Sequence, residues 1–313
     1  MKTRPTVEAF HIFFGDLSIH SYSVQMPSNK MIDVTILETG KVRVRPTMME
    51  QPATRPVFLR RLRFLADRRW TDWLPVYAFL ISHPDGNILF DAGLSPHCKD
   101  PGYFPFWMPT FKLTSEIDLR GTEGVSAQLR EKGIDPKDLK SVVISHLHYD
   151  HSGGLPDLAG APVCMLEEHW NAFKNRFYAT MEGATPDQWP KDFVPEFLQP
   201  TGPALGPFER TYPITSDGKV VAVQTPGHVP GHLSLIVYAD EVTYLLTGDA
   251  TYSQELLDQE LTDGVNGDPL TAVATLRKIK ELARQLPLVV LAAHDEDSIR
   301  RKEAREIYKP SNL

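Results

Sequence analysis

Short runs of apolar, often β-branched residues recur along the chain, separated by stretches rich in polar residues, Pro and Gly. Runs of this length and composition predict β-strands, and turn-forming residues such as those at 84–87 bound many of them. The predicted strands cover residues 34–37, 76–81, 88–90, 142–144, 220–223, 233–237, 244–246 and 288–291.

Three segments instead repeat their apolar residues at the spacing of a helix. Residues 122–132 begin with a hydroxyl residue that can cap a helix, and they end before a glycine. Residues 268–285 place Asp268 at the cap and Pro269 in the first turn, and a third helix is predicted over residues 167–178. Because the predicted strands occur in clusters broken by helices, we expect sheets covered by helices.

Residues 31–313 are expected to form a single domain, preceded by an N-terminal arm at residues 1–30 that carries several aromatic side chains. Large exposed apolar surfaces are uncommon, so we expect the arm to pack either on its own domain or on the second subunit of a homodimer. Two long segments, residues 99–121 and 179–217, lack a clear pattern, as functional loops often do. The aromatic loop at 101–111 can fill a gap in the core or form a pocket wall, and we expect it to form a pocket wall.

The charge balance argues against a nucleic-acid partner. The chain has 33 basic and 40 acidic residues, and its basic clusters at 55–63 and 300–302 alternate with apolar or acidic residues. No stretch approaches the roughly 18 apolar residues of a membrane span, and the N-terminus lacks the pattern of a secretory signal. Cys98 and Cys164 are expected to be free thiols, so we predict a cytoplasmic protein without a membrane partner.

The sequence SHLHYDHSGG at residues 145–154 directly follows a predicted strand and places three histidines and an aspartate within six positions. Buried polar groups need partners, so packing alone explains such a cluster poorly. Residues two apart in an extended segment point the same way, which lets His146 and His148 share one metal ion. Asp150 and His151 then face a neighbouring point, and the segment therefore predicts two metal ions.

Three more candidate ligands lie further along the chain. His228, Asp249 and His294 each come directly after one of the apolar runs that predict a strand. Residues at strand ends often carry chemistry, because a rigid scaffold presents them. Each alone is an ordinary turn residue or a hydrogen-bonded histidine, but together with the histidine segment they form a set of metal ligands.

The order HxHxDH, His, Asp, His resembles the metallo-β-lactamase superfamily, and the resemblance covers residues 34–295. It implies an α+β protein with a four-layer αβ/βα sandwich and two divalent metal ions at one edge. Zinc is the expected metal because imidazole and carboxylate ligands suit it, with Co, Mn or Fe as alternatives. The resemblance also implies that Asp91 orients the histidine segment, although an ordinary turn role stays open. It assigns His146, His148 and His228 to the first ion and Asp150, His151 and His294 to the second, with Asp249 bridging both.

Two segments, GDATY at 248–252 and TPGHVPGH at 225–232, resemble the N-acyl-homoserine lactonases, the quorum-quenching branch of that superfamily. The resemblance implies a hydrolase that opens the lactone ring of such lactones. Two cations about 3.5–4 Å apart would hold a bridging hydroxide that attacks the carbonyl. Tyr252 would help a metal to stabilise the oxyanion, and Asp150 would carry the proton. The alternative for Tyr252 is packing against a sheet edge.

Other functions fit the same residues. A general carboxylester hydrolase or arylesterase, or a thioester hydrolase of the same superfamily, would use the same site on another small molecule. The main dizinc β-lactamases carry Cys where Asp249 stands, which disfavours that reaction. A protein that binds metal without catalysis is less favoured, because structural zinc sites are normally closed, whereas this ligand set leaves open positions.

Overall fold

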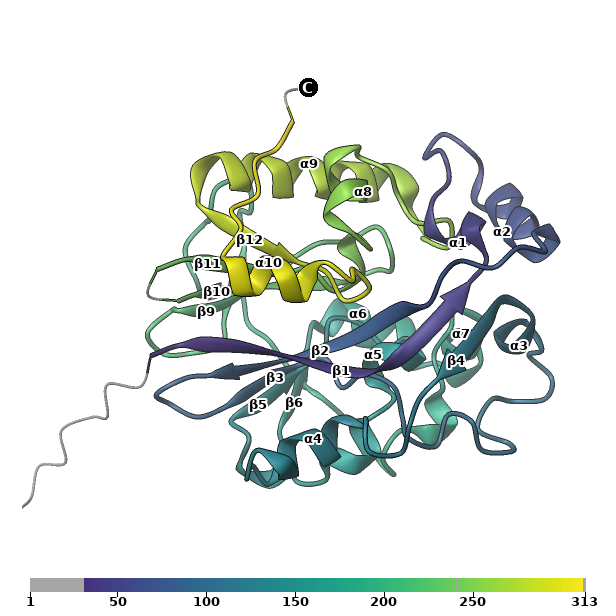
Figure 1. The fold of residues 1–313 in the computed structure, drawn as a ribbon, viewed down its shortest axis with the longest axis horizontal. Helices are drawn as coiled ribbons and strands as arrows, with labels where there is room; N and C mark the ends of the chain where they lie inside the picture. The colour runs from purple at the N-terminus through teal and green to yellow at the C-terminus, as the bar shows by residue number, and fades with distance from the viewer. Residues whose placement is uncertain (1–30, 240, 312–313) are drawn as a thin grey trace, which may run out of the picture.

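Two β-sheets packed face to face form the centre of the computed structural model, which describes residues 31–239 and 241–311 (Figure 1). The seven-stranded sheet has the order β4 (Ser115–Asp118), β1 (Asp33–Val44), β2 (Leu74–Ser82), β3 (Ile88–Phe90), β5 (Ser141–Val143), β6 (Val163–Met165) and β7 (Glu196–Phe197). The five-stranded sheet has the order β12 (Leu288–Leu291), β11 (Thr243–Leu246), β10 (Leu233–Tyr238), β9 (Val220–Gln224) and β8 (Thr211–Pro213).

The core between the two sheets follows from the alternation of side chains along each strand. Tyr77, Phe79 and Ile81 of β2 share one buried cluster with Leu235 and Val237 of β10. Successive side chains of a strand point to opposite faces, so every second residue of β2 points into this inter-sheet layer. The residues between them join a second apolar cluster under the outer helices. Both faces of β2 are therefore buried, which explains its nearly continuous apolar sequence.

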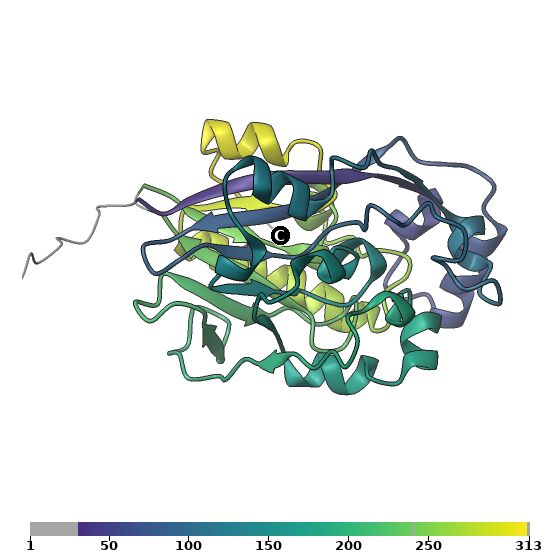
Figure 2. The same ribbon diagram turned by 90° about the horizontal axis from the view of Figure 1, so that it is seen from below.

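Helices cover the outer faces of both sheets. In Figure 1, α9 (Pro269–Gln285) lies above the five-stranded sheet and α4 (Val125–Glu131) below the seven-stranded one. The view from below in Figure 2 looks onto that second helical layer. The predicted four-layer αβ/βα sandwich is confirmed. The other α-helices are α1 (Pro46–Met49), α2 (Val57–Ala66), α3 (Thr110–Thr114), α5 (Tyr149–Ser152), α6 (Glu167–Phe173), α7 (Arg176–Met181), α8 (Gln254–Asp258) and α10 (Ser298–Ala304).

The structure changes the bounds of two predicted helices. The helix predicted over 122–132 begins later, at Val125, and its cap is Gly124, which has no side chain to supply a hydroxyl. The helix predicted over 167–178 is two helices, α6 and α7, because Asn175 interrupts it. The Asn175 side chain accepts a hydrogen bond from Tyr178 N and caps α7, so the local polar contact ends the first helix. The helix predicted over 268–285 is confirmed, with Asp268 accepting from Thr271 N.

The long segments without a pattern contain short elements of their own. Residues 99–121 include α3 and β4, and residues 179–217 include β7 and β8. Cys98 and Cys164 are both free, as expected from the sequence, and both are buried. Over the described ranges, no helix combines the length and the apolar character needed to cross a bilayer. The predicted arm at residues 1–30 lies outside the described residues.

Candidate metal centre

Every predicted metal ligand lies just beyond the carboxyl end of a strand, at one shared edge of the two sheets. The histidine segment follows β5, and its second half forms the short helix α5 rather than the extended segment that was expected. One further ligand follows β9, one lies in the 3₁₀ turn Gly248–Ala250 after β11, and one follows β12. The residues brought together are His146, His148, Asp150, His151, His228, Asp249 and His294.

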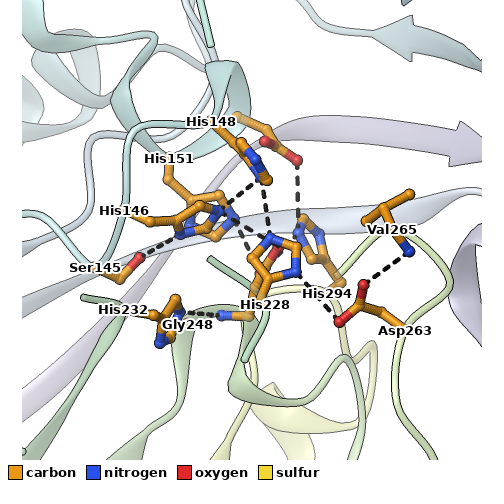
Figure 3. Close-up of polar contacts among 12 residues, drawn as sticks. Ser145, His146, His148, His151, His228, His232, Gly248, Asp263, Val265 and His294 are labelled. Carbon is orange, nitrogen blue, oxygen red and sulfur yellow. Dashed lines mark hydrogen bonds and ion pairs between the residues drawn. The ribbon is translucent and has the colours of Figure 1, made fainter. Parts of the chain in front are cut away.

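These side chains form two groups that each suit a cation (Figure 3). In the first group, the Nδ1 atom of His148 lies 2.9 Å from His146 Nε2 and 3.0 Å from His228 Nε2. In the second group, His294 Nε2 lies 3.6 Å from the Oδ2 atom of Asp150. The second group is completed by His151.

Asp249 stands between the two groups. Its Oδ1 atom lies 3.0 Å from His151 Nε2 and 3.3 Å from His294 Nε2. Its Oδ2 atom lies 3.5 Å from His228 Nε2 and 3.8 Å from His146 Nε2. One carboxylate oxygen therefore faces each group, which is the arrangement that a bridging ligand requires.

The donor atoms themselves fit divalent cations. His151 Nε2 and Asp249 Oδ1 are buried and 3.0 Å apart, yet neither has a hydrogen-bond partner. Leaving such atoms unpaired is costly, and a cation between them satisfies both. Burial and the neighbouring histidines lower the pKa of His146 and of His148 well below the usual value, so these rings stay neutral. Imidazole nitrogens and carboxylate oxygens are ligands that zinc accepts.

Asp91 supports the histidine segment from the end of β3. Its Oδ2 atom lies 2.8 Å from His151 Nδ1, and both side chains are fully buried. The same carboxylate accepts hydrogen bonds from the backbone N–H and the hydroxyl of Ser145, at 2.7 and 2.8 Å. Of the two roles that the sequence left open, this geometry favours the one that orients the segment.

Two histidines without an assigned ligand role hold the backbone of the ligand segments. The Nε2 atom of His169 accepts a hydrogen bond from Leu147 N at 2.9 Å. The Nε2 atom of His232 accepts from Asp249 N at 3.1 Å. Burial lowers the pKa of His169 to about 4, which keeps its accepting nitrogen unprotonated. Both histidines therefore position the backbone of candidate ligands, and neither belongs to one of the two metal-binding groups.

The sequence analysis did not identify the residue that contacts His228 Nδ1, the ring nitrogen that points away from the other candidate ligands. The Oδ2 atom of Asp263 lies 3.2 Å from His228 Nδ1 (Figure 3). A carboxylate in this position fixes the tautomer and the orientation of a ligand imidazole. Asp263 belongs to no motif and is separated from His228 by 35 positions, so only the fold reveals the pairing.

Tyr252 lies beside both groups and lines a cavity of about 270 Å³. Its ring centroid lies 5.4 Å from that of His294 and 6.1 Å from that of His228. Burial, followed by the charges of Asp263 and Asp249, raises the pKa of Tyr252 well above its usual value. The phenol therefore stays protonated and can donate a hydrogen bond.

The walls of this cavity are largely apolar. The aromatic loop contributes Met108 to its wall, and it also packs internally, since the Phe104 ring stacks on Phe111 at 4.9 Å. Both roles considered for that loop therefore occur together. The apolar side chains that line the cavity are Val42, Val44, Met48, Met49, Phe64, Leu65, Leu74, Met108, Phe111, Met181 and Val265.

The chain belongs to the metallo-β-lactamase superfamily, because residues 71–294 match the family model described as Metallo-beta-lactamase superfamily. This range includes all the candidate ligands and Tyr252. The resemblance found in the sequence is confirmed.

Curated relatives within this superfamily are N-acyl homoserine lactonases. AttM of Azorhizobium caulinodans is 30% identical over 72% of this chain and 83% of its own length. AttM of Rhizobium radiobacter is 29% identical over 75% of this chain and 88% of its own. AiiA of Bacillus thuringiensis subsp. kurstaki is 26% identical over 71% of this chain and 82% of its own.

Solved structures share the fold. One is an N-acyl homoserine lactone hydrolase with the product N-hexanoyl-L-homoserine at its catalytic metal centre; it has a TM-score of 0.67 at 20% identity and covers 90% of this chain and 98% of its own. AidC, a dizinc quorum-quenching lactonase in complex with the same product, has a TM-score of 0.57 at 13% identity, covering 85% of this chain and 89% of its own. At these identities the likeness concerns the fold alone.

Proposed function

We propose that this chain is a dinuclear-metal hydrolase that opens the lactone ring of N-acyl-homoserine lactones or similar lactones. The observation that carries the proposal is the place of Tyr252, which lies beside both metal-binding groups and lines the same largely apolar cavity as His148 and His294. A substrate with a small polar ring and an apolar tail matches a cavity that combines metal-binding groups with an apolar wall. The names of the curated relatives support the same substrate class.

The proposed site contains seven metal ligands, His146, His148, Asp150, His151, His228, Asp249 and His294. When bound, two divalent ions supply a Lewis acid for the substrate carbonyl and acidify water. Zinc is the metal we propose, since the donor atoms are imidazole nitrogens and carboxylate oxygens. AidC, which shares the fold, is described as a dizinc lactonase.

The residues of the chain account for the remaining steps. The protonated Tyr252 hydroxyl donates a hydrogen bond to the carbonyl oxygen as negative charge develops there. Hydrolysis joins the oxygen of water to the carbonyl carbon and breaks the ring C–O bond, so the leaving oxygen must gain a proton. Asp150 lines the cavity, and its carboxylate can take the proton from water and return it to that oxygen. The apolar wall holds the acyl chain and excludes water.

Three features of the protein outside the site belong to the same proposal. We propose a cytoplasmic location, which agrees with two free buried thiols. A homodimer is proposed as the assembly, and light scattering tests it: a monomeric mass that does not change with concentration would refute the dimer. The single-domain organisation of residues 31–313 is supported by the continuous buried clusters between and outside the sheets.

A substrate panel tests the function. Zinc-loaded protein should hydrolyse N-acyl-homoserine lactones with a higher kcat/KM than an aryl ester, a thioester or a β-lactam. Faster hydrolysis of the aryl ester or the thioester than of every lactone would replace the proposal with a general esterase or a thioester hydrolase. No hydrolysis of any of them by fully loaded protein would favour a protein that binds metal without catalysis.

A further inference from the structure

A fully buried arginine links the α1–α2 segment, residues 46–66, to a loop that contacts the candidate metal ligand His228. Arg60 of α2 has an exposed fraction of 0%. Its Nη1 atom donates to two carbonyl oxygens of its own segment, Gln51 O at 3.1 Å and Pro52 O at 2.7 Å. A buried cation is costly unless it is fully paired, so these contacts alone do not account for its position.

The other half of the guanidinium reaches residues 262–268, which we call the support loop. The Nη2 atom donates to Asp263 O, to Thr262 Oγ1 at 3.3 Å and to Asn266 Oδ1 at 3.4 Å. Burial lowers the pKa of Arg60, and the negative charge of Asp263 opposes that shift. One side chain thus joins two segments that lie about two hundred positions apart in the sequence.

The support loop holds the metal ligand His228 from two sides. The carboxylate of Asp263 lies 3.2 Å from His228 Nδ1, and Gly267 N donates to His228 O at 3.0 Å. The same carboxylate is itself fixed, because Val265 N donates to its Oδ1 atom at 3.0 Å and Asn266 Nδ2 to its Oδ2 atom at 3.1 Å. The position of the loop therefore determines the orientation of the His228 ring.

The α1–α2 segment and the support loop meet backbone to backbone. Gly264 N donates to Met48 O at 2.8 Å, and Gln51 N donates to Thr262 O at 3.1 Å. A Cβ atom at Gly264 would lie 1.8 Å from Thr47 O, so only glycine allows this approach. Because the two backbones approach so closely, they cannot move past each other. A displacement of α2 would therefore also displace the support loop.

We propose that Arg60 is a positioning residue for the first metal-binding group, acting through Asn266 and Asp263 on the imidazole of His228. Arg60 lies before residue 71, where the match to the family model begins. The proposal rests on the metal centre and not on the identity of the substrate. The segment that Arg60 fixes also supplies Met48, Phe64 and Leu65 to the cavity wall, so it ties one wall of the cavity to the metal centre.

Zinc binding in the absence of substrate tests this role. Metal-free wild type, Arg60→Met, Asp263→Asn and the double variant are titrated with zinc against a chromophoric chelator to obtain the two stepwise Kd values. Asp263→Asn should weaken one of the two values by roughly ten- to a hundredfold, the usual cost of losing a carboxylate behind a ligand histidine. Arg60→Met should weaken the same value by up to about tenfold, and the double variant should equal Asp263→Asn, because residues that act in series are not additive.

Arg45→Met is the matched control. Arg45 is also buried, and it donates to the carbonyl oxygens of Arg68, Arg69 and Leu113, which belong neither to the metal-binding groups nor to the cavity lining. Its loss should lower the free energy of unfolding and leave both zinc Kd values unchanged. If Arg60→Met does not fold, Asn266→Ala removes only the intermediate contact, and it should weaken zinc binding severalfold.

Three results would overturn the proposal. One is unchanged zinc affinity in a folded Arg60→Met protein, or in Asn266→Ala where Arg60→Met is unfolded. Another is equal weakening in Arg60→Met and Arg45→Met, which would make the effect one of general stability. The last is additivity of the Arg60 and Asp263 effects in the double variant. Since no substrate is involved, these results are independent of whether lactones are hydrolysed.

Discussion

The ring of Tyr252 stands perpendicular to the ring of His294, with 5.4 Å between their centroids. It also lies edge-on to His228, a member of the other metal-binding group, at 6.1 Å. Tyr252 is therefore adjacent to one candidate ligand of each group while being part of neither. A hydroxyl in this place can act on a substrate bound at the metals without helping to bind them.

Tyr252→Phe should separate catalysis from metal binding. The substitution removes one hydrogen-bond donor and little volume, so kcat/KM for a homoserine lactone should fall by roughly ten- to a thousandfold, the range for one oxyanion donor. Kinetics and elemental analysis on the same preparation measure both quantities. Full activity in the Phe variant would make Tyr252 a packing residue and favour a general esterase.

Asp249→Ala should affect metal content as well as catalysis, because the carboxylate faces both metal-binding groups. Its loss leaves four histidine nitrogens without their shared partner, so metal content and activity should fall together. Asp258→Ala is a suitable control, since Asp258 accepts from Tyr308 and Ser311 away from the site. Retention of two ions by the Asp249 variant would contradict the bridging role.

Metal removal should be reversible. Dialysis of the whole protein against a chelator should abolish lactone hydrolysis, and two equivalents of zinc, cobalt or manganese per chain should restore it. The stoichiometry follows from the two groups of ligands that share Asp249. Elemental analysis that finds one ion or none in fully active protein would refute the dinuclear site.

Much of the candidate site could be predicted because the candidate ligands follow strands that the apolar pattern already predicts. His146, His148 and His151 lie in a short segment after β5, and the structure brings them together with His294, which follows β12. The cap residue Asp268, Pro269 in the first turn and the apolar spacing were likewise sufficient to predict the helix α9.

The rest depended on contacts between distant parts of the chain. Asp263 and Arg60 carry no local pattern, and their roles arise only when the support loop meets the α1–α2 segment. The break between α6 and α7 shows the other limit, since the apolar spacing continued across Asn175 while one side-chain hydrogen bond ended the helix. Periodicity reports which face is buried, but not where a polar side chain competes with the backbone.

The two cysteines allow a prediction of pH dependence. Burial raises the pKa of Cys98 to about 12 and that of Cys164 to about 11, from 9.0 in the unfolded chain. Both thiols therefore favour the folded state fully below pH 9.0, and this contribution is lost as the pH rises toward the folded values. Urea denaturation should show that the free energy of unfolding of the wild type falls more steeply above pH 9.0 than that of the double variant Cys98→Ala, Cys164→Ala. Equal slopes would show that the thiols ionise alike in both states.

The position of bond cleavage in an N-acyl-homoserine lactone tests the central claim most directly. Zinc-loaded protein is incubated with N-hexanoyl-L-homoserine lactone in water enriched in heavy oxygen, and the products are identified by mass spectrometry. The account predicts a single product, N-hexanoyl-L-homoserine, with one heavy oxygen atom in its new carboxylate. Release of hexanoic acid and homoserine lactone, or no reaction by protein that holds two ions and cleaves an aryl ester, would contradict it.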